Sequence, residues 1–304
     1  MKFGQGTAVK RNWAEITIEA LIRATGYSAI LFVALILIFL LREGLPTLGE
    51  VPFGDLLSAR WYPIEDHYGL WPLIGGTLIV TVGATLIAVP LGLATAVFIA
   101  EVAPRWAREI LKPLVEVLAG LPSVVLGFLG MLVLAPVVRT ALNIPTGLSA
   151  FTGSLLLAAM ALPTLVSVAE DALDSVPQSY RQAALALGAT QWQTIWRVTV
   201  PAARAGVLTA VMLGIGRAIG ETMTVMMVTG NAAHLPLGLG ALFEPVRTMT
   251  ATIAAEMGDV SQGSTHYHVL FAVGLILFLF SWVINLIASA LVFKERKRAE
   301  RLLS

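Results

Sequence analysis

The sequence predicts an all-α integral membrane protein of six transmembrane helices with both termini in the cytoplasm. Of its 304 residues, 57% are hydrophobic and 13% are charged, and the mean hydropathy is +0.82. Soluble domains average about 25% charged residues, so this composition is typical of a membrane protein. The apolar residues gather in six long stretches, and the basic residues lie mostly in alternate connecting segments.

Each transmembrane helix needs about 20 largely apolar residues, because about 30 Å of hydrocarbon is crossed at about 1.5 Å per residue. Six segments meet this requirement, at residues 24–41, 73–100, 117–138, 141–169, 205–230 and 269–293. Three of them contain prolines, which remove backbone donors: Pro90, Pro122, Pro136 and Pro163. Neighbouring helices or cavity water have to satisfy the freed carbonyls, so we expect broken or kinked spans.

The distribution of basic residues predicts the orientation. Fifteen of them lie before span 1, between spans 2 and 3, between spans 4 and 5, and after span 6. The alternate segments hold only Arg42, Arg60, Arg139 and Arg247, and the remaining basic residue, Arg217, lies inside span 5. The positive-inside rule therefore places both termini in the cytoplasm, including the N-terminal residues Lys2, Lys10 and Arg11.

Four segments follow from these spans: a cytoplasmic N-terminal tail (1–25), an anchor helix with an external loop (26–72), a transmembrane domain (73–293) with a cytoplasmic loop at 170–204, and a basic cytoplasmic tail (294–304). We expect the first apolar stretch to be a retained helix, because no small-residue cleavage site follows it at Leu41-Arg42-Glu43-Gly44. The external loops, about 42–72 and 231–267, carry aromatic residues suited to the headgroup level: Trp61, Tyr62, Trp71 and Tyr267. Docking of an external partner is the alternative interpretation of these loops.

Several classes of function are disfavoured by composition and motifs. The net charge is only +1 and no basic stripe is present, which argues against nucleic-acid binding. Without cysteine there is no disulfide, thiol catalysis or thiolate metal site. The sequence contains no P-loop, zincin or nucleophile-elbow motif, so we expect no catalytic residue, metal or cofactor in this chain. We interpret His266 and His268 as a membrane-edge feature rather than a metal site.

The cytoplasmic loop 170–204 contains a short helix pattern. Residues 180–187 are good helix formers and Gly188 follows them, as is typical of a helix C-terminus. An amphipathic piece with two tryptophans comes next (191–200), and we expect Pro201 to close it. Small residues at 183, 184 and 188 permit the close approach of another backbone. This spacing leaves two interpretations open, an interfacial linker and a docking site for a soluble partner.

The same loop resembles the EAA loop of ABC importer permeases, whose pattern is Glu-Ala-Ala, three residues, Gly, nine residues, Ile-x-Leu-Pro. In that family a short coupling helix from this loop sits in a groove of the ATPase subunit. The spacing matches at every position: Gln182, Ala183, Ala184, Gly188, Val198, Val200 and Pro201. The leading glutamate is replaced by Gln182, which alters one polar contact to the ATPase but leaves the small residues their packing role.

Two further stretches resemble phosphate ABC-transporter permeases. Residues 116–127, which run from Glu116 through Pro122 and Ser123, are similar to the family segment E-x-L-A-G-I-P-S-V-V-x-G. Residues 214–225 look like the G-R-A-x-G-E-T-M segment of its PstC subunits, whereas the sister PstA subunits have Ala-Pro-Leu after the Glu-Thr. The likeness covers about residues 75–293. It implies the type I ABC importer permease fold, with 73–293 as the permease domain.

Arg217 and Glu221 are the candidate residues of the substrate pathway. Four residues apart on a helix, they are expected to share one face and to pair. A charge near the bilayer midplane costs from about 2.5 to more than 10 kcal/mol, so both should face a bundle interior or a wet cavity. One interpretation is an ion pair that only fixes helix packing. The other is a site where Arg217 binds two oxygens of phosphate. Glu221 competes with phosphate for Arg217, so that the phosphate can leave.

Three further residues join this candidate pathway in a lesser role. Ser123 and Thr222 are candidate hydroxyl donors to the anion. Glu116, which we expect near the cytoplasmic end of span 3, either gates the passage or reaches to the membrane surface.

Taken together, the resemblance implies a permease subunit that imports inorganic phosphate across the bacterial cytoplasmic (inner) membrane and is not itself an enzyme. The implied partners are a second permease of the PstA type, an ATPase dimer of the PstB type that holds ATP and Mg, an external phosphate-binding protein of the PstS type, phosphate and membrane lipid. A permease for sulfate or molybdate is the nearest alternative. An ATP-independent transporter with Glu221 as proton carrier is another, although it needs no EAA-like loop, and an intramembrane enzyme lacks a catalytic set.

Overall fold

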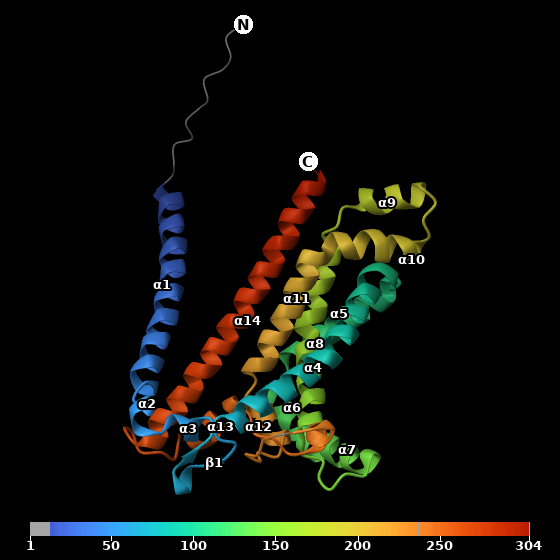
Figure 1. The fold of residues 1–304 in the computed structure, drawn as a ribbon. Helices are drawn as coiled ribbons and strands as arrows, with labels where there is room; N and C mark the ends of the chain where they lie inside the picture. The colour runs from blue at the N-terminus through green and yellow to red at the C-terminus, as the bar shows by residue number, and fades with distance from the viewer. Residues whose placement is uncertain (1–12, 236, 304) are drawn as a thin grey trace.

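The computed structural model describes residues 13–235 and 237–303, and the predicted Lys2, Lys10 and Arg11 lie outside them. The all-α prediction is confirmed: apart from one two-stranded sheet, β1 (Trp61–Tyr62) with β2 (His67–Tyr68), the described chain is built from helices (Figure 1). Within it, six segments are long and apolar enough to cross a membrane: Thr17–Glu50, Trp71–Val102, Ser123–Leu142, Ala150–Asp174, Gln191–Gly220 and Thr265–Lys294.

The described ends of the chain lie at the same end of the helical bundle (Figure 1). The start of α1 (Trp13–Gly44) and the end of α14 (Thr265–Leu303) are found there, beside α9 (Gln178–Ala186) and α10 (Gln191–Thr194). Short elements fill the opposite end: α2 (Thr47–Glu50), α3 (Phe53–Leu56), η1 (Pro63–Glu65), β1, β2, α7 (Ala135–Leu142), η5 (Leu239–Phe243) and α13 (Met249–Glu256). Helix α1 begins at Trp13, so the segment predicted as a tail, 1–25, already contains part of the first helix.

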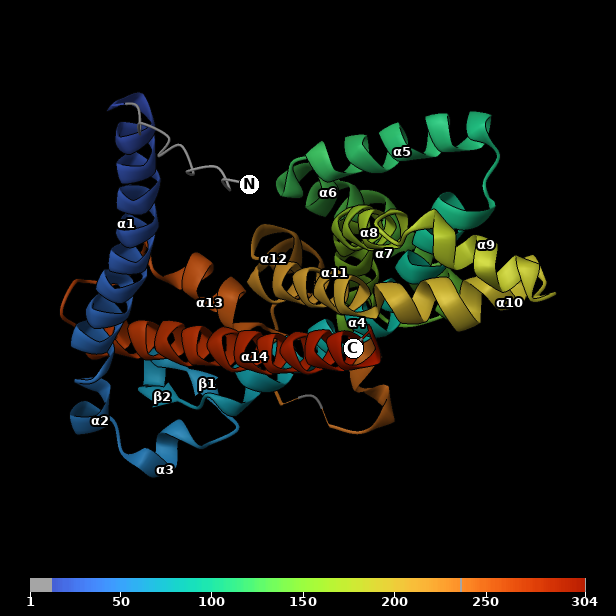
Figure 2. The ribbon, with the colours of Figure 1, turned by 90° about the horizontal axis from the view of Figure 1, so that it is seen from above.

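Helix α8 (Ala150–Asp174) forms the centre of the bundle and packs against α4 (Trp71–Val97), α5 (Arg105–Gly120) and α11 (Val200–Gly220). Small buried residues such as Ala84, Ala88 and Ala161 allow α4 and α8 to approach closely, as is typical of membrane helices. Helix α1 stands apart from this centre (Figure 2) and meets α14 through Phe39, whose ring lies 5.4 Å from that of Phe271. The central helices are therefore the part of the fold that positions a site.

Of the four prolines predicted to disturb the spans, Pro122 lies at a break between helices. Helices α4 and α8 continue through Pro90 and Pro163. In contrast, the chain is extended at Leu121 and Pro122, where ψ is 130° and 134°, and this break separates α5 from α6 (Ser123–Leu129). The expectation of broken spans is confirmed at Pro122.

Three π-helical turns lie just before other prolines, where the helix lacks a backbone hydrogen-bond donor. They are η2 (Phe98–Val102), η3 (Gly130–Leu134) and η4 (Ile195–Thr199), and each ends two residues before Pro104, Pro136 or Pro201. The carbonyl four residues before each proline lacks its usual donor and falls inside the wider turn. Arg108 donates to one of these carbonyls, that of Ala100, at 2.6 Å. Our prediction that Pro201 closes a helix is wrong, because the helix runs on without interruption from Gln191 to Gly220.

A polar cluster centred on Glu256 holds the end opposite the termini together. Its carboxylate accepts hydrogen bonds from Arg247 at 2.6 Å and Trp61 at 3.2 Å, and lies 2.9 Å from His266 Nε2. Trp61 is only 4% exposed, so its ring packs inside this cluster and contributes little to the outer surface of the protein. Burial and a hydrogen bond to Asp66 raise the pKa of the neighbouring Tyr68 to about 12.

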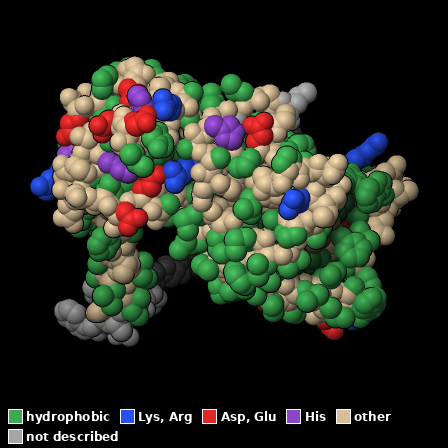
Figure 3. Space-filling view, turned by 90° about the horizontal axis from the view of Figure 1, so that it is seen from below, with side chains coloured by type: hydrophobic (Ala, Val, Ile, Leu, Met, Phe, Trp, Pro, Cys, Tyr) green, Lys and Arg blue, Asp and Glu red, His purple; other side chains and the backbone are tan. Residues whose placement is uncertain are grey.

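Histidine and acidic side chains gather on this end of the molecule (Figure 3). The other described histidines also lie beside carboxylates, in the pairs His67–Asp55, His234–Glu244 and His268–Glu50. Among the described residues no group of three metal-ligating side chains gathers around them.

Substituting Glu256 by Ala is expected to destabilise this end by about 3 kcal/mol, because it leaves the largely buried Arg247 charge unpaired. The measurement is the midpoint of denaturation of the purified protein. Glu65→Ala is the matched control, since its partner Arg60 and Glu65 itself are 64% and 56% exposed and such pairs contribute at most about 1 kcal/mol. Equal losses in the two variants would contradict a structural role for the Glu256 cluster.

Candidate substrate pathway and coupling segment

The breaks in spans 3 and 5 lie side by side. Helix α11 ends at Gly220, Glu221 is extended, and α12 (Met223–Val228) begins two residues later. Helices α6 and α12 approach so closely that a Cβ on Gly127 would lie 2.9 Å from Met227 Sδ. The hydroxyl of Thr224 donates to the backbone oxygen of Ser123 at 2.9 Å, which fixes the start of α12 against the start of α6.

This arrangement brings two helix N-termini to the same place. The first-turn N–H groups of a helix have no intrahelical acceptor, and the helix dipole makes that end partly positive. One such group, the N–H of Thr224, donates to Glu221 Oε1 at 3.3 Å. Half-helix N-termini of this kind at broken spans are suited to anionic solutes.

Arg217 lies close to these breaks, three residues before α11 ends. Its guanidinium is exposed in this chain and donates to Thr164 Oγ1 at 3.3 Å. Because Thr164 lies near the middle of α8, Arg217 lies near the middle of the bundle. Its charge therefore sits at a depth where few ionisable residues are found in membrane proteins.

The predicted pairing of Arg217 with Glu221 is wrong. The helix on which the spacing of four was counted ends at Gly220, and the extended backbone at Glu221 carries its side chain away from the helical position. The described residues contain no ion pair between the two. Glu221 instead accepts from α12, and its backbone oxygen accepts from the Thr250 hydroxyl of α13 at 3.0 Å.

The remaining predicted pathway residues also lie at the two breaks. Ser123 is half-buried at the start of α6, and the Thr222 hydroxyl donates to the backbone oxygen of Gly220 at 3.3 Å. Glu116 is exposed and lies one turn before α5 ends at Gly120, on the α5 side of the break. Sequence reasoning missed Thr164 and Thr250, since single hydroxyls in apolar helices give no signal until the helices are placed.

Residues 178–200, called the coupling segment from here on, begin with the predicted short helix. Helix α9 is followed by Gly188, whose φ of +84° is a left-handed conformation that favours glycine. Of the EAA-like residues, Gln182, Ala183, Gly188 and Pro201 are exposed, whereas Ala184 is buried. A hollow of about 460 Å³ lies between α9 and the following helix, lined by Tyr180, Ala183, Ala184, Leu187, Ala189, Gln193, Arg197 and Val198.

The second half of the coupling segment is continuous with the helix that carries Arg217. Residues Gln191–Gly220 form one helical rod of 30 residues. This half of the coupling segment and Arg217 therefore lie on one continuous helix, which includes the π-helical turn η4.

Comparison with known proteins agrees with this geometry. The match to one family assigns the class of protein, a membrane component of a binding-protein-dependent transport system. Residues 88–297 match the binding-protein-dependent transport system inner membrane component family, and the chain belongs to that family.

Its relatives include two bacterial permeases. It is 39% identical over 257 residues to the probable ABC transporter permease protein YqgH of Bacillus subtilis, which covers 83% of this chain and 82% of that protein. It is 35% identical over 299 residues to the phosphate transport system permease protein PstC of Mesorhizobium japonicum, covering 91% and 90%.

Solved structures of ABC importers share the fold. An alginate ABC transporter superposes with a TM-score of 0.63 at 16% identity, covering 93% of this chain and 98% of that chain. The inward-facing MetNI methionine transporter gives a TM-score of 0.58 at 18% identity, covering 78% and 99%. At these identities the likeness concerns the fold alone.

Proposed function

We propose that this chain is the membrane permease subunit of an ATP-driven importer of inorganic phosphate. One observation carries the proposal: Arg217 lies near the middle of the bundle, three residues before α11 breaks ahead of the N-terminus of α12, and this chain leaves it exposed. The related PstC permeases, named for phosphate transport and 30–35% identical over most of the chain, support phosphate as the cargo.

The exposed face around Arg217 supports a second membrane subunit. Apolar side chains near the breaks are also uncovered, among them Leu121, Val124 and Met223. An arginine facing lipid at this depth costs at least about 2.5 kcal/mol, whereas one facing a wet passage between two subunits does not. A sister permease of the PstA type would cover this face and complete the passage.

Phosphate fits the groups that converge there. A guanidinium donates two parallel hydrogen bonds to two oxygens of a tetrahedral anion, and helix N-termini add partial positive charge. In the present state Arg217 is held by the neutral hydroxyl of Thr164, so an arriving anion exchanges one weak hydrogen bond and does not have to break an ion pair. The Glu221 carboxylate beside the N-terminus of α12 limits how tightly the anion is held, which allows its release.

The two ends of the bundle would serve different partners. The coupling segment 178–200 would dock on a cytoplasmic ATPase dimer of the PstB type, which binds ATP and Mg. The opposite end, with its paired histidines and carboxylates, would receive phosphate from a binding protein of the PstS type. Under this proposal the coupling segment and both termini would lie in the cytoplasm of a bacterium, with the spans in its inner membrane.

Complementation tests the proposal in cells. We expect this chain, expressed with its sister permease and ATPase, to restore growth at limiting phosphate in a strain that lacks its own permease pair. The ATPase should co-purify with the chain. If growth is restored on limiting sulfate or molybdate instead of phosphate, the transported anion is that one and not phosphate. Growth that is restored without the ATPase would refute ATP-driven import.

Glu221→Gln tests the role of the carboxylate. The amide oxygen still accepts from Thr224, but the negative charge beside the anion is lost. We expect tighter binding and slower release, with the KM for phosphate and the maximal uptake rate both lowered about tenfold, which corresponds to about 1.4 kcal/mol. The concentration dependence of uptake measures both constants. If the KM and the maximal uptake rate of Glu221→Gln equal those of the wild type, Glu221 only caps α12.

A further inference from the structure

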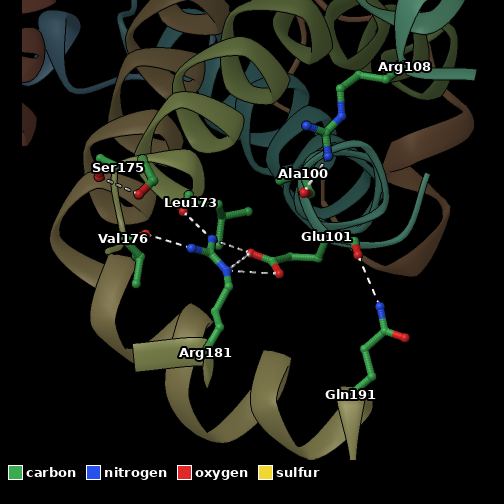
Figure 4. A network of polar contacts seen from close by, with 9 residues as sticks. Ala100, Glu101, Arg108, Leu173, Ser175, Val176, Arg181 and Gln191 are labelled. Atoms are coloured by element: carbon green, nitrogen blue, oxygen red, sulfur yellow. Dashed lines mark hydrogen bonds and ion pairs between the residues drawn. The ribbon is translucent and has the colours of Figure 1, made fainter. Parts of the chain in front are cut away.

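A buried ion pair ties the coupling segment to the core of the bundle (Figure 4). Arg181 of α9 donates to Glu101 of η2 through Nη2 at 2.6 Å and through Nε at 3.2 Å. The side chains are only 14% and 9% exposed. The two residues are 80 positions apart in the sequence, so the contact depends on the tertiary fold.

Arg181 also bonds to the end of α8. Its Nη1 donates to the backbone oxygen of Val176 at 2.6 Å and its Nη2 to that of Leu173 at 2.9 Å. Glu101 is contacted by the other half of the coupling segment as well, because Gln191 Nε2 donates to its backbone oxygen at 3.4 Å. One guanidinium and one acidic residue thus join α9, the start of α10, α8 and the end of α4.

A second ion pair holds α5 to the same end of α8. Lys112 Nζ lies 3.2 Å from Glu170 Oε1, and the Glu170 side chain is 3% exposed. Hydrogen bonding to Glu170 raises the pKa of Lys112, so this lysine stays protonated across the physiological range. The end of α8 next to the coupling segment is therefore fixed on two sides.

A buried ion pair such as Arg181–Glu101 does not stabilise a helix contact more than apolar packing does. Apolar residues of similar volume often stabilise such a site as well or better, because they avoid the desolvation of two charges. What the pair adds is a single geometry: three hydrogen bonds to the carboxylate and two to defined carbonyls leave α9 one position relative to α8 and η2.

We infer that Arg181 and Glu101 are positioning residues that transmit the movement of the ATPase to α8 and α4. The inference rests on the proposed function. The hydrogen bond between Arg217 and Thr164 joins α11 to α8. The coupling segment reaches α11 through the continuous helix, and it reaches α8 through Arg181. With the Arg181–Glu101 pair intact, α8 and α11 both move with the ATPase, and the hydrogen bond between Thr164 and Arg217 moves with them. Without the Arg181–Glu101 pair, α11 moves and α8 does not follow it fully.

The test is the number of phosphate ions taken up per ATP hydrolysed by the complete reconstituted complex. For Glu101→Gln and Arg181→Gln we expect this ratio to fall at least tenfold while assembly persists and basal hydrolysis stays within twofold of wild type. The double Gln variant should lose no more than either single variant, because one interaction is removed in all three. The matched controls Glu65→Gln and Arg60→Gln remove an exposed ion pair and should leave the ratio unchanged.

Two results would overturn the inference: an unchanged ratio in the Gln variants, or uptake and hydrolysis that fall together. If the Gln variants fail to assemble, Arg181→Lys decides, because it keeps a positive donor beside Glu101 and the two carbonyls but loses the planar fork. Assembly with a lowered ratio and wild-type basal hydrolysis supports coupling, and a wild-type ratio, or no assembly, contradicts it.

The controls separate this inference from the proposed function. A wild-type complex that hydrolyses ATP without taking up phosphate would contradict the function alone. The pair would then be tested by the factor by which the binding protein stimulates hydrolysis, which the Gln variants should lose.

Discussion

Replacing Arg217 by Gln is expected to lower phosphate uptake by about 10- to 100-fold, the loss that corresponds to charge-assisted hydrogen bonds of about 1.5–3 kcal/mol. Assembly with the ATPase and basal hydrolysis should persist, because Arg217 is exposed in this chain and its described contact within it is one hydrogen bond to Thr164. The measurement is the initial rate of labelled phosphate uptake at a fixed amount of assembled complex.

Two controls define what Arg217 contributes. Arg217→Lys keeps the charge but loses the planar fork, so its uptake should be intermediate. Thr164→Val removes only the resting partner of Arg217 and should change uptake much less than Arg217→Gln. A complex that no longer assembles after Arg217→Gln would show that the residue holds the subunits together, and unchanged uptake would place the passage elsewhere.

Introducing Trp at Gly188 is expected to abolish uptake while the chain still inserts in the membrane. A Cβ built at Gly188 meets nothing within 4 Å, so the added side chain starts in open space on the surface that would face the ATPase. The measurements are co-purification of the ATPase and ATP-driven uptake. Normal uptake by this variant would contradict a docking role for the coupling segment.

The left-handed backbone at Gly188 calls for a separate control. Its φ of +84° strains any L-residue, so part of the Trp effect is conformational. Asn tolerates this conformation and is small, and Gly188→Asn should therefore retain most of the uptake. If Asn and Trp are equally harmful, the backbone rather than the bulk of the side chain is responsible.

Local features of the sequence predicted much of the fold. Six apolar stretches gave six spans, the good helix formers before Gly188 gave α9, and Pro122 gave a broken helix. These features depend on residues close together in the chain. Backbone chemistry at single positions was less predictable: the helix passes through Pro201 because η4 accommodates the missing donor, and it stops at Gly220 although the apolar pattern continues to 230.

The candidate site was predicted in its residues but not in its contacts. Arg217, Glu221, Ser123 and Thr222 all lie at the two breaks, yet the expected pairing of Arg217 with Glu221 does not form, because it assumed an unbroken helix. The contacts that replace it join distant segments. Thr164 is 53 residues from Arg217, and Glu101 is 80 residues from Arg181. A single sequence carries no local signal of such pairs, since they depend on how α8 lies against α4 and α11.

Uptake of labelled phosphate into proteoliposomes is the most direct test of the central claim. The liposomes hold this chain with its sister permease and ATPase, the binding protein is added on the opposite side from the ATPase, and ATP is present or absent on the ATPase side. The account predicts uptake that requires ATP and is unaffected by an excess of sulfate. Uptake without ATP, or ATP-driven uptake that sulfate abolishes, would contradict an ATP-driven phosphate permease.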